Sequence, residues 1–275
     1  MSIIDTYDYK ALSFKLLKAT SQQCARIPSV TITAPPGTVI LGGGAYVDWQ
    51  SPPCAPQCPP GNLLTAMYPD NSGKTWTVAS KFHIQANSAQ ITAYCIVAQM
   101  KNGTPISPDN YKVVSATSGP VTSKPTKQVN LPVGFTVVGG GAKANYTGAG
   151  SLLYASYPAG LSGWVGSAKD HLNADPSTIT VWAIGLKESF LKDNGMFVSS
   201  FNLSSSSAVS HPRLTFVKPN FRLTGVGARV NGPQDIGNLL TASFPQDRQT
   251  VVAEGKDHVQ GDPETITAFA VGFVG

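Results

Sequence analysis

Three short stretches that end in histidine recur along the chain. They read Lys-Phe-His at 81–83, Lys-Asp-His at 169–171 and Lys-Asp-His at 256–258. Ammonium, carboxylate and imidazole groups at this spacing can bind a metal ion or a polar ligand, or can tie down a turn. The chain therefore offers one candidate site in each of three segments.

The orientation of the three histidines decides between these possibilities. If they face a common axis, three imidazoles could hold one metal ion, since three histidines form a known zinc arrangement. If they face outward, each segment has its own ligand site beside a loop. In the third interpretation, Asp and His end a strand and hydrogen-bond the following turn. Phe82 replaces the aspartate in the first segment, so a site that uses Asp170 and Asp257 should be weakened there.

Other polar and aromatic residues stand at fixed distances from these histidines. Trp76 and Trp164 lie seven residues before a histidine and could stack against a sugar ring, but Val251 at the third such position favours a core role. Asn62 and Asn238 could donate to a polar ligand or satisfy turn backbone. The candidate ligand-binding set is Lys81, His83, Lys169, Asp170, His171, Lys256, Asp257, His258, Trp76, Trp164, Asn62 and Asn238.

The chain has no sequence signature of an enzyme. It lacks the G-x-S-x-G, H-E-x-x-H and P-loop motifs, each of which has a defined catalytic geometry. Adjacent residues of a strand point to opposite faces, so Asp170 and His171 are not expected to act as a catalytic pair. We expect no enzymatic activity, no cofactor and no bound metal.

The histidine stretches belong to a longer internal repeat. Ungapped alignment matches Phe14–Ala45, Tyr111–Ala142 and Phe197–Ala228, each closing on a glycine-rich run. Three further blocks follow in the same order in each segment: N-L-L-T-A-M-Y-P from Asn62, with counterparts from Ser151 and Asn238; the histidine stretch; and I-T-A-Y-C-I-V from Ile91, with counterparts from Ile179 and Ile266. A glycine-rich run within a strand predicts a bulge or a close approach of backbones.

The repeat predicts an all-β fold of three tandem units of about 85–97 residues, because abundant turn formers and alternating apolar residues are typical of short strands. The unit boundaries are 1–105 (with a Cys/Pro-rich insertion at 50–61), 106–192 and 193–275. In the first unit we expect strands at 13–20, 29–34, 38–49, 63–68, 76–81 and 90–98, and we expect short loops at 101–110 and 187–195. One compact domain with pseudo-threefold symmetry, β-prism-like or barrel-like, is favoured over three separate β-sandwiches.

Cysteine usage and net charge limit the partners and the cellular location that we expect. Cys54 and Cys58 lie in the insertion and could form a local disulfide or remain free thiols, whereas Cys24 and Cys95 resemble ordinary small buried residues. The net charge is +5 without a basic cluster, which argues against a nucleic-acid partner and allows weak attraction to an anionic membrane surface. Without a signal peptide or an apolar span, we expect synthesis in the cytosol and release by a non-classical route.

The expected architecture resembles the threefold β-prism lectins and the prism-like receptor-binding modules of bacterial toxins, at the level of the fold. Repeated shallow sites gain avidity on a surface where ligands are clustered. The sequence therefore favours a non-enzymatic, lectin-like protein whose partners are glycans or a cell-surface receptor. A membrane-active or insecticidal toxin and a structural surface protein are the alternatives; the oligomeric state is left open.

Overall fold

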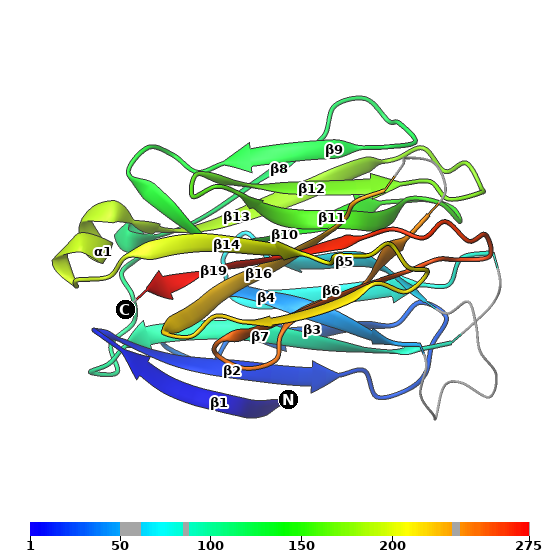
Figure 1. The fold of residues 1–275 in the computed structure, drawn as a ribbon. Helices are drawn as coiled ribbons and strands as arrows, with labels where there is room; N and C mark the ends of the chain where they lie inside the picture. The colour runs from blue at the N-terminus through cyan, green and yellow to red at the C-terminus, as the bar shows by residue number, and fades with distance from the viewer. Residues whose placement is uncertain (50–61, 85–87, 233–236, 275) are drawn as a thin grey trace.

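The protein is an all-β structure, as the composition predicted. The computed structural model describes residues 1–49, 62–84, 88–232 and 237–274 (Figure 1). Over these residues the strands form three antiparallel sheets. In hydrogen-bonded order, sheet I contains β1 (Ser2–Tyr9), β2 (Leu12–Thr20), β7 (Gln90–Met100), β4 (Val39–Asp48), β17 (Leu239–Pro245), β18 (Thr250–Lys256) and β15 (Arg213–Val217). Sheet II contains β3 (Ser29–Thr33), β6 (Thr75–Lys81), β5 (Leu63–Pro69), β10 (Phe135–Asn145), β13 (Thr178–Lys187) and β8 (Tyr111–Thr117). Sheet III contains β14 (Val198–Ser204), β19 (Ile266–Val274), β16 (Phe221–Val230), β11 (Leu152–Ala159), β12 (Gly163–Lys169) and β9 (Thr126–Asn130).

The six strands predicted for residues 13–98 are confirmed to within two residues at each end, as β2 to β7. Three elements of the described chain were not predicted. Strand β1 precedes the first predicted strand, and two short helices lie where loops were expected: η1 (Pro108–Asn110) within 101–110 and α1 (Glu188–Asp193) within 187–195. Helix α1 is short and buries Phe190 and Leu191, so its stability comes from this packing rather than from a long apolar periodicity.

Each sheet combines strands from two of the segments compared in the sequence. Sheet I joins β2, β7 and β4 to β17, β18 and β15, and its two halves pair at Ala45 with Ser243. Sheets II and III are joined in the same way, through Ala142 with Met67 and through Ala228 with Ser156. One hydrophobic core includes residues of all three sheets, among them Leu16, Ile184 and Val271. The segments are therefore interleaved through the sheets.

The glycine-rich runs form the predicted bulges and the predicted close approach. The strand register shifts between Ile40 and Gly42, and at the matching places in β10 and β16. A Cβ atom added to Gly225 would lie 2.7 Å from the Cα atom of Gly139, and one added to Gly139 would lie 2.9 Å from that of Gly42. One added to Gly42 would in turn lie 2.9 Å from the Cα atom of Gly225. We call these three residues the glycine centre, where three backbones touch.

Register in the third segment departs from the ungapped alignment. Ala98, Leu186 and Phe273 are equivalent positions of β7, β13 and β19. Their strand partners are Phe14, Tyr111 and Val198, whereas the ungapped alignment matches Phe14 and Tyr111 with Phe197. Phe197 therefore precedes the strand. The cause is a turn one residue shorter before β16, where Asn220 takes the positive φ that Gly37 and Gly134 take elsewhere.

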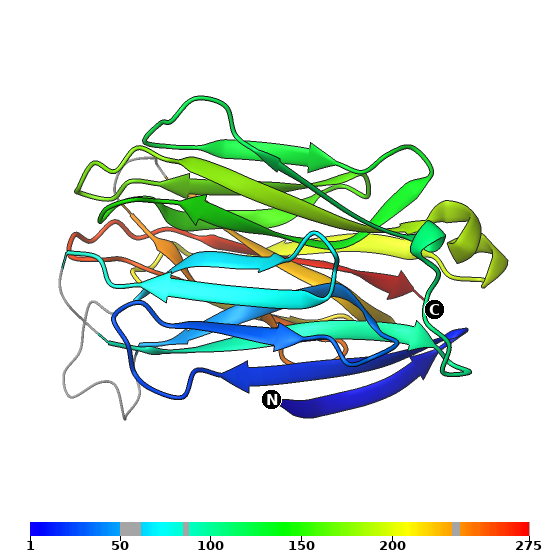
Figure 2. The same ribbon diagram turned by 180° about the vertical axis from the view of Figure 1, so that it is seen from behind.

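Two ends of the body can be told apart in Figures 1 and 2. Helix α1 and the C-terminus lie at one end, which we call the helix end. The loops that follow β6, β12 and β18 lie at the other, which we call the loop end. Within the described residues, none of the helices has the length and apolar character needed to cross a membrane.

The cysteines divide into two kinds. Cys95 is free and fully buried, as expected. Cys24 is disulfide-bonded, so its interpretation as an ordinary buried residue was wrong. A disulfide at a half-exposed position constrains a loop rather than filling a core. Cys54 and Cys58 lie outside the described residues.

Candidate functional site at the loop end

The three repeated histidines meet beneath the loop end. Their ring centroids are 5.4 Å apart for His83 and His171, 5.0 Å for His83 and His258, and 5.7 Å for His171 and His258. All three residues are fully buried. We call them the histidine cluster. Of the sequence interpretations, convergence rather than outward display describes their position.

Each ring donates to a backbone carbonyl instead of pointing at a shared centre. The Nε2 atom of His171 lies 2.5 Å from the carbonyl oxygen of His258, and the Nε2 atom of His258 lies 2.5 Å from that of His83. The Nδ1 atom of His83 lies 2.7 Å from the carbonyl oxygen of Ala149. Because a carbonyl only accepts, each of these nitrogens carries the hydrogen. The cluster therefore ties together the turns that follow three strands.

Burial favours the neutral form of His83 and of His171. It lowers the pKa of His83 and of His171 below the ordinary value, and their hydrogen bonds to backbone groups oppose this in part. The Nδ1 atom of His171 is buried and has no hydrogen-bond partner in the described part of the chain. A proton there would add a buried charge without an acceptor, which is strongly unfavourable.

A metal site does not follow from this convergence. Among the described residues, no group of three or more His, Cys, Asp or Glu side chains is arranged to hold a metal ion. The ring nitrogens that face carbonyl oxygens carry a hydrogen and do not ligate. The other nitrogens of His83 and His171, Nε2 and Nδ1, are buried without a hydrogen-bond partner among the described residues. The chemistry of the cluster is that of a hydrogen-bonded clasp.

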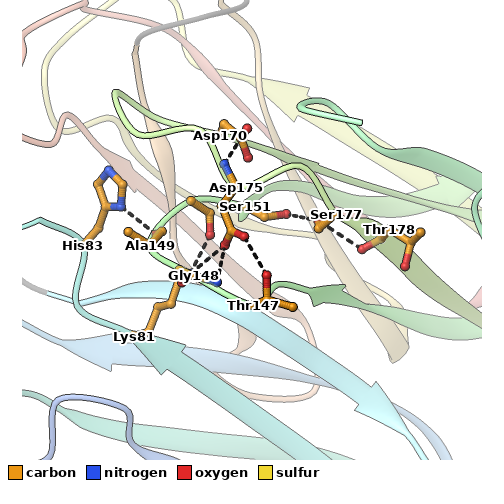
Figure 3. A network of polar contacts seen from close by, with 11 residues as sticks. Lys81, His83, Thr147, Gly148, Ala149, Ser151, Asp170, Asp175, Ser177 and Thr178 are labelled. Carbon is orange, nitrogen blue, oxygen red and sulfur yellow. Dashed lines mark hydrogen bonds and ion pairs between the residues drawn. The ribbon is translucent and has the colours of Figure 1, made fainter. Parts of the chain in front are cut away.

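The lysine of the first stretch reaches into the loop after β10 (Figure 3). Its Nζ atom lies 2.7 Å from the carbonyl oxygen of Gly148, 2.5 Å from that of Gly150, and 3.6 Å from the centroid of the Tyr146 ring. The Asp175 carboxylate lies 3.9 Å from this Nζ atom and accepts from the backbone N–H of Gly148 at 2.8 Å. Burial lowers the pKa of Lys81 to about 8, although Asp175 opposes this shift. Lys81 thus fixes a loop that belongs to another segment.

The other two lysines are also buried. Lys169 is 4% exposed and lines a small cavity of about 50 Å³ with Glu264 and Tyr154. The Nζ atom of Lys256 lies 4.3 Å from the centroid of the Trp49 ring, and burial lowers the pKa of this lysine to about 7. Burial also raises the pKa of Glu264 to about 7, with nearby Lys169 opposing the shift.

The acidic and amide residues of the candidate set hold turns. Asp170 accepts from the backbone N–H of Asp175 at 2.9 Å. Asp257 accepts from the Nδ2 atom of Asn238 at 2.7 Å, and Asn62 accepts from the hydroxyl of Ser80 at 3.1 Å. These contacts match the turn-holding interpretation of the sequence. Direct ligand contact by the candidate residues, and its expected weakening beside Phe82, stay predictions.

Both tryptophans lie in the core. Trp76 and Trp164 have no exposed surface, so stacking with a sugar would require the strands to separate. A Cβ atom added to Gly43 would lie 2.6 Å from the Trp76 ring, which shows how closely the ring covers this glycine. Trp164 covers Gly140 in the same way. In the third segment Val226 stands at the position of the glycine and Val251 at the position of the tryptophan. The larger side chain at the glycine position thus accompanies the smaller one at the tryptophan position.

Comparison with known proteins adds no assignment. The chain matches no protein-family model and is similar to no curated protein in a sequence search. The site is therefore interpreted from its geometry.

Three exposed aliphatic residues at the loop end were missed by the sequence reasoning. Ile84, Leu172 and Val259 each follow a residue of the histidine cluster, are 42%, 45% and 54% exposed, and have φ of 58°, 60° and 66°. We call them the aliphatic triplet. The left-handed conformation costs about 1–2 kcal/mol for a residue other than glycine, and it is especially rare for β-branched residues. The signal in the sequence was an aliphatic residue directly after each of the three histidines.

Hydrogen bonds explain how this conformation is held. The backbone N–H of Asn173 donates to the carbonyl oxygen of His171 at 2.7 Å, and Gln260 donates to His258 at the same distance. A bond from residue i+2 back to residue i closes a tight turn around a residue with positive φ. The same His258 carbonyl also accepts from the His171 ring. The histidine cluster therefore fixes the turns that present the aliphatic triplet.

Proposed function

We propose that this is a non-enzymatic, lectin-like binding protein that contacts glycans or a receptor on a cell surface through its loop end. The observation that carries the proposal is the aliphatic triplet, three exposed apolar side chains held in an unfavourable backbone conformation by buried histidines. Strained conformations persist where surrounding structure enforces them, and they concentrate at functional sites. Exposed apolar residues gathered at one place are typical of interaction surfaces.

The proposal includes a pseudo-threefold arrangement of the three segments. It is supported by the matching strand orders of the three sheets, by the glycine centre and by the histidine cluster. An axis through both clusters would present the aliphatic triplet as three related contacts. A ligand that engages several of them gains affinity by avidity.

In this proposal the buried candidate residues position the binding loops. Lys81, His83 and their counterparts act through the turns that they hold, and the ligand meets the loop surface above them. This role requires no reacting group, because the ligand is bound and not converted.

The test compares two sets of surface substitutions. One variant carries Ile84→Ser, Leu172→Ser and Val259→Ser; the matched control carries Ile3→Ser, Val133→Ser and Val217→Ser, which are exposed aliphatic residues away from the loop end. Wild type and both variants are applied to a glycan array and to cultured cells with and without glycosidase treatment. We expect the loop-end variant to lose binding at least tenfold, about 1.4 kcal/mol, and the control to bind like wild type. Wild type that binds neither glycans nor cells, or equal binding by both variants, would overturn the proposal.

A further inference from the structure

Strand β1 gives sheet I a seventh strand that the other two sheets lack. It pairs antiparallel with β2 along its length. In the described structure, β8 and β14 take the place of β2 in sheets II and III and are the edge strands there. An edge strand presents unpaired N–H and C=O groups that can pair with an added strand. The molecule itself therefore shows one way of covering such an edge.

Two tyrosines anchor β1. The Tyr7 ring stacks on Phe14 with centroids 5.0 Å apart, and its hydroxyl donates to the carbonyl oxygen of Leu223 at 3.1 Å. The Tyr9 ring stacks on Phe273 at 5.6 Å, and its hydroxyl donates to the carbonyl oxygen of Val274 at 2.6 Å. Alternate side chains of a strand point to the same face. The anchoring pattern of β1 is thus Tyr-x-Tyr.

At β8, the chain supplies its own ring. Tyr111, the register counterpart of Phe14, donates from its hydroxyl to the carbonyl oxygen of Ile40 at 2.6 Å. Ile40 is the counterpart of Leu223 at the strand bulge. The carbonyl group equivalent to the acceptor of Tyr7 therefore already accepts a hydrogen bond from Tyr111 at β8. A cavity of about 350 Å³ lies beside Tyr111.

At β14, the corresponding place is open. The register counterpart of Phe14 and Tyr111 is Val198, which carries no ring. A cavity of about 340 Å³ lies there, and its lining includes Thr136, Leu161 and Val198. Thr136 and Leu161 correspond to Arg222 and Arg248. The carbonyl oxygen of Leu161 accepts from the backbone N–H of Val137, and that of Arg248 accepts from the backbone N–H of Leu223, the equivalent residue at the bulge. This cavity is the counterpart of the place where Tyr7 is buried.

The surface around this cavity is suited to an aromatic segment. Phe197 and Leu161 line it and are 67% and 37% exposed. Lys192 and Glu188 also line it, so a cation is present there beside one carboxylate. At the corresponding edge of sheet I, β1 brings acidic residues to cations: Asp5 lies 3.6 Å from Arg248 and Asp8 lies 3.3 Å from Lys101. Strand addition combines backbone pairing along the edge with side-chain pockets that give specificity.

We propose that β14 and the adjoining cavity bind an extended segment of a partner protein that carries tyrosines at alternate positions beside acidic residues, in the way that β1 covers β2. The backbone of the segment pairs with the free edge of β14. One tyrosine ring enters the cavity against Val198 and Leu161. This surface lies toward the helix end and is separate from the loop end proposed to contact the cell surface.

The probe for the test is a synthetic peptide with the sequence of residues 2–9, Ser-Ile-Ile-Asp-Thr-Tyr-Asp-Tyr, added to the full-length protein. We expect saturable binding by calorimetry, with hydrogen-exchange protection confined to residues 198–204. Replacing both peptide tyrosines by alanine should weaken binding at least tenfold. A peptide N-methylated at alternate residues should also fail, because it cannot pair with the strand edge.

A protein variant separates the cavity from the bare edge. Val198→Tyr places a phenol where Tyr111 has one at β8, and we expect at least tenfold weaker peptide binding. Val217→Tyr, an exposed valine of another edge strand, is the matched control and should bind like wild type, with thermal unfolding showing that both variants are folded. Binding unaffected by Val198→Tyr, protection at residues 12–20 or 111–117 instead, or no binding would overturn the proposal. Protection of 198–204 that rises with protein concentration alone would mean that a second copy is the occupant, and would also overturn it.

Discussion

The glycine centre and the histidine cluster are both places where the three sheets converge, but they are held together differently. In the glycine centre, backbone meets backbone around Gly42, Gly139 and Gly225. In the histidine cluster, buried rings bridge the gap and hydrogen-bond to carbonyl oxygens. The first contact has no side chain that can adjust. The second depends on three buried imidazoles, and burial lowers the pKa of two of them, His83 and His171.

This difference assigns different roles to the two places. Close-packed backbone fixes the relative positions of β4, β10 and β16. The histidine cluster fixes its turns through ring N–H groups that donate to carbonyl oxygens. One place is therefore closed by backbone packing, and the other by hydrogen bonds from buried side chains.

The largest expected effect is at the glycine centre. Gly139→Ala places a methyl group among the backbone atoms of Leu41 and Gly42, where no rotamer can relieve the clash. We expect a loss of unfolding free energy of about 3 kcal/mol, measured by urea denaturation. Gly119→Ala is the matched control, because a Cβ atom there meets nothing within 4 Å. Equal stability of the two variants would show that the backbones do not touch.

A smaller effect is expected from acid at the loop end. The pKa values of His83 and His171 are lowered by burial, so the unfolded chain takes up protons at the ordinary value near 6.5 while the folded chain does not. Their contribution to the unfolding free energy is therefore present above that value and is lost as the pH falls below it. Glu264 acts in the opposite direction, because its pKa is raised to about 7 and its contribution increases as the pH falls from 7 toward 4.5.

Glu264→Gln isolates the histidine contribution. The amide retains an acceptor for the backbone N–H of Asn238, which the carboxylate binds at 3.0 Å, but it does not titrate. We expect its unfolding free energy to fall more steeply between pH 7 and pH 5 than that of wild type, in urea titrations at each pH. Glu188→Gln removes an exposed carboxylate and should parallel wild type. Parallel curves for wild type and Glu264→Gln would contradict the assignment.

The strands could be predicted because the signals that define them are local. The run from Ile91 to Val97 alternates and is bounded by turn formers, and the glycine-rich runs carry the mark of a bulge. Strand β1 was missed because its stability is not local: Tyr7 and Tyr9 are held by Phe14, Phe273 and distant carbonyl groups. Pairing between segments, as at Ala45 and Ser243, likewise has no signature in either strand alone.

The candidate site could be located but not oriented from the sequence. The spacing of the histidine stretches showed that the three histidines occupy equivalent positions. It did not show their orientation, because an outward ligand site and an inward hydrogen-bonded clasp use the same residue types. The exchange of Gly43 and Trp76 for Val226 and Val251 was legible in the sequence and supports a core position for the tryptophans. The aliphatic triplet was overlooked because a single exposed aliphatic residue is ordinary. What distinguishes these three residues is their positive φ, and the presence of an aliphatic residue in a sequence does not predict that conformation.

The smallest expected effect separates strain from binding in that triplet. Val259→Gly removes a side chain from a residue with φ of 66°, which relieves about 1–2 kcal/mol of strain, while the greater freedom of glycine in the unfolded chain costs about 0.5–1 kcal/mol. We expect an unfolding free energy equal to wild type or up to about 1.5 kcal/mol higher. Val217→Gly, at a residue of similar exposure within β15, should lower it by about 0.5–1 kcal/mol. Because Val259→Gly keeps the fold, any loss of cell-surface binding in this variant reports the missing side chain, whereas a loss of stability would show that the turn prefers valine and that the strain does not exist.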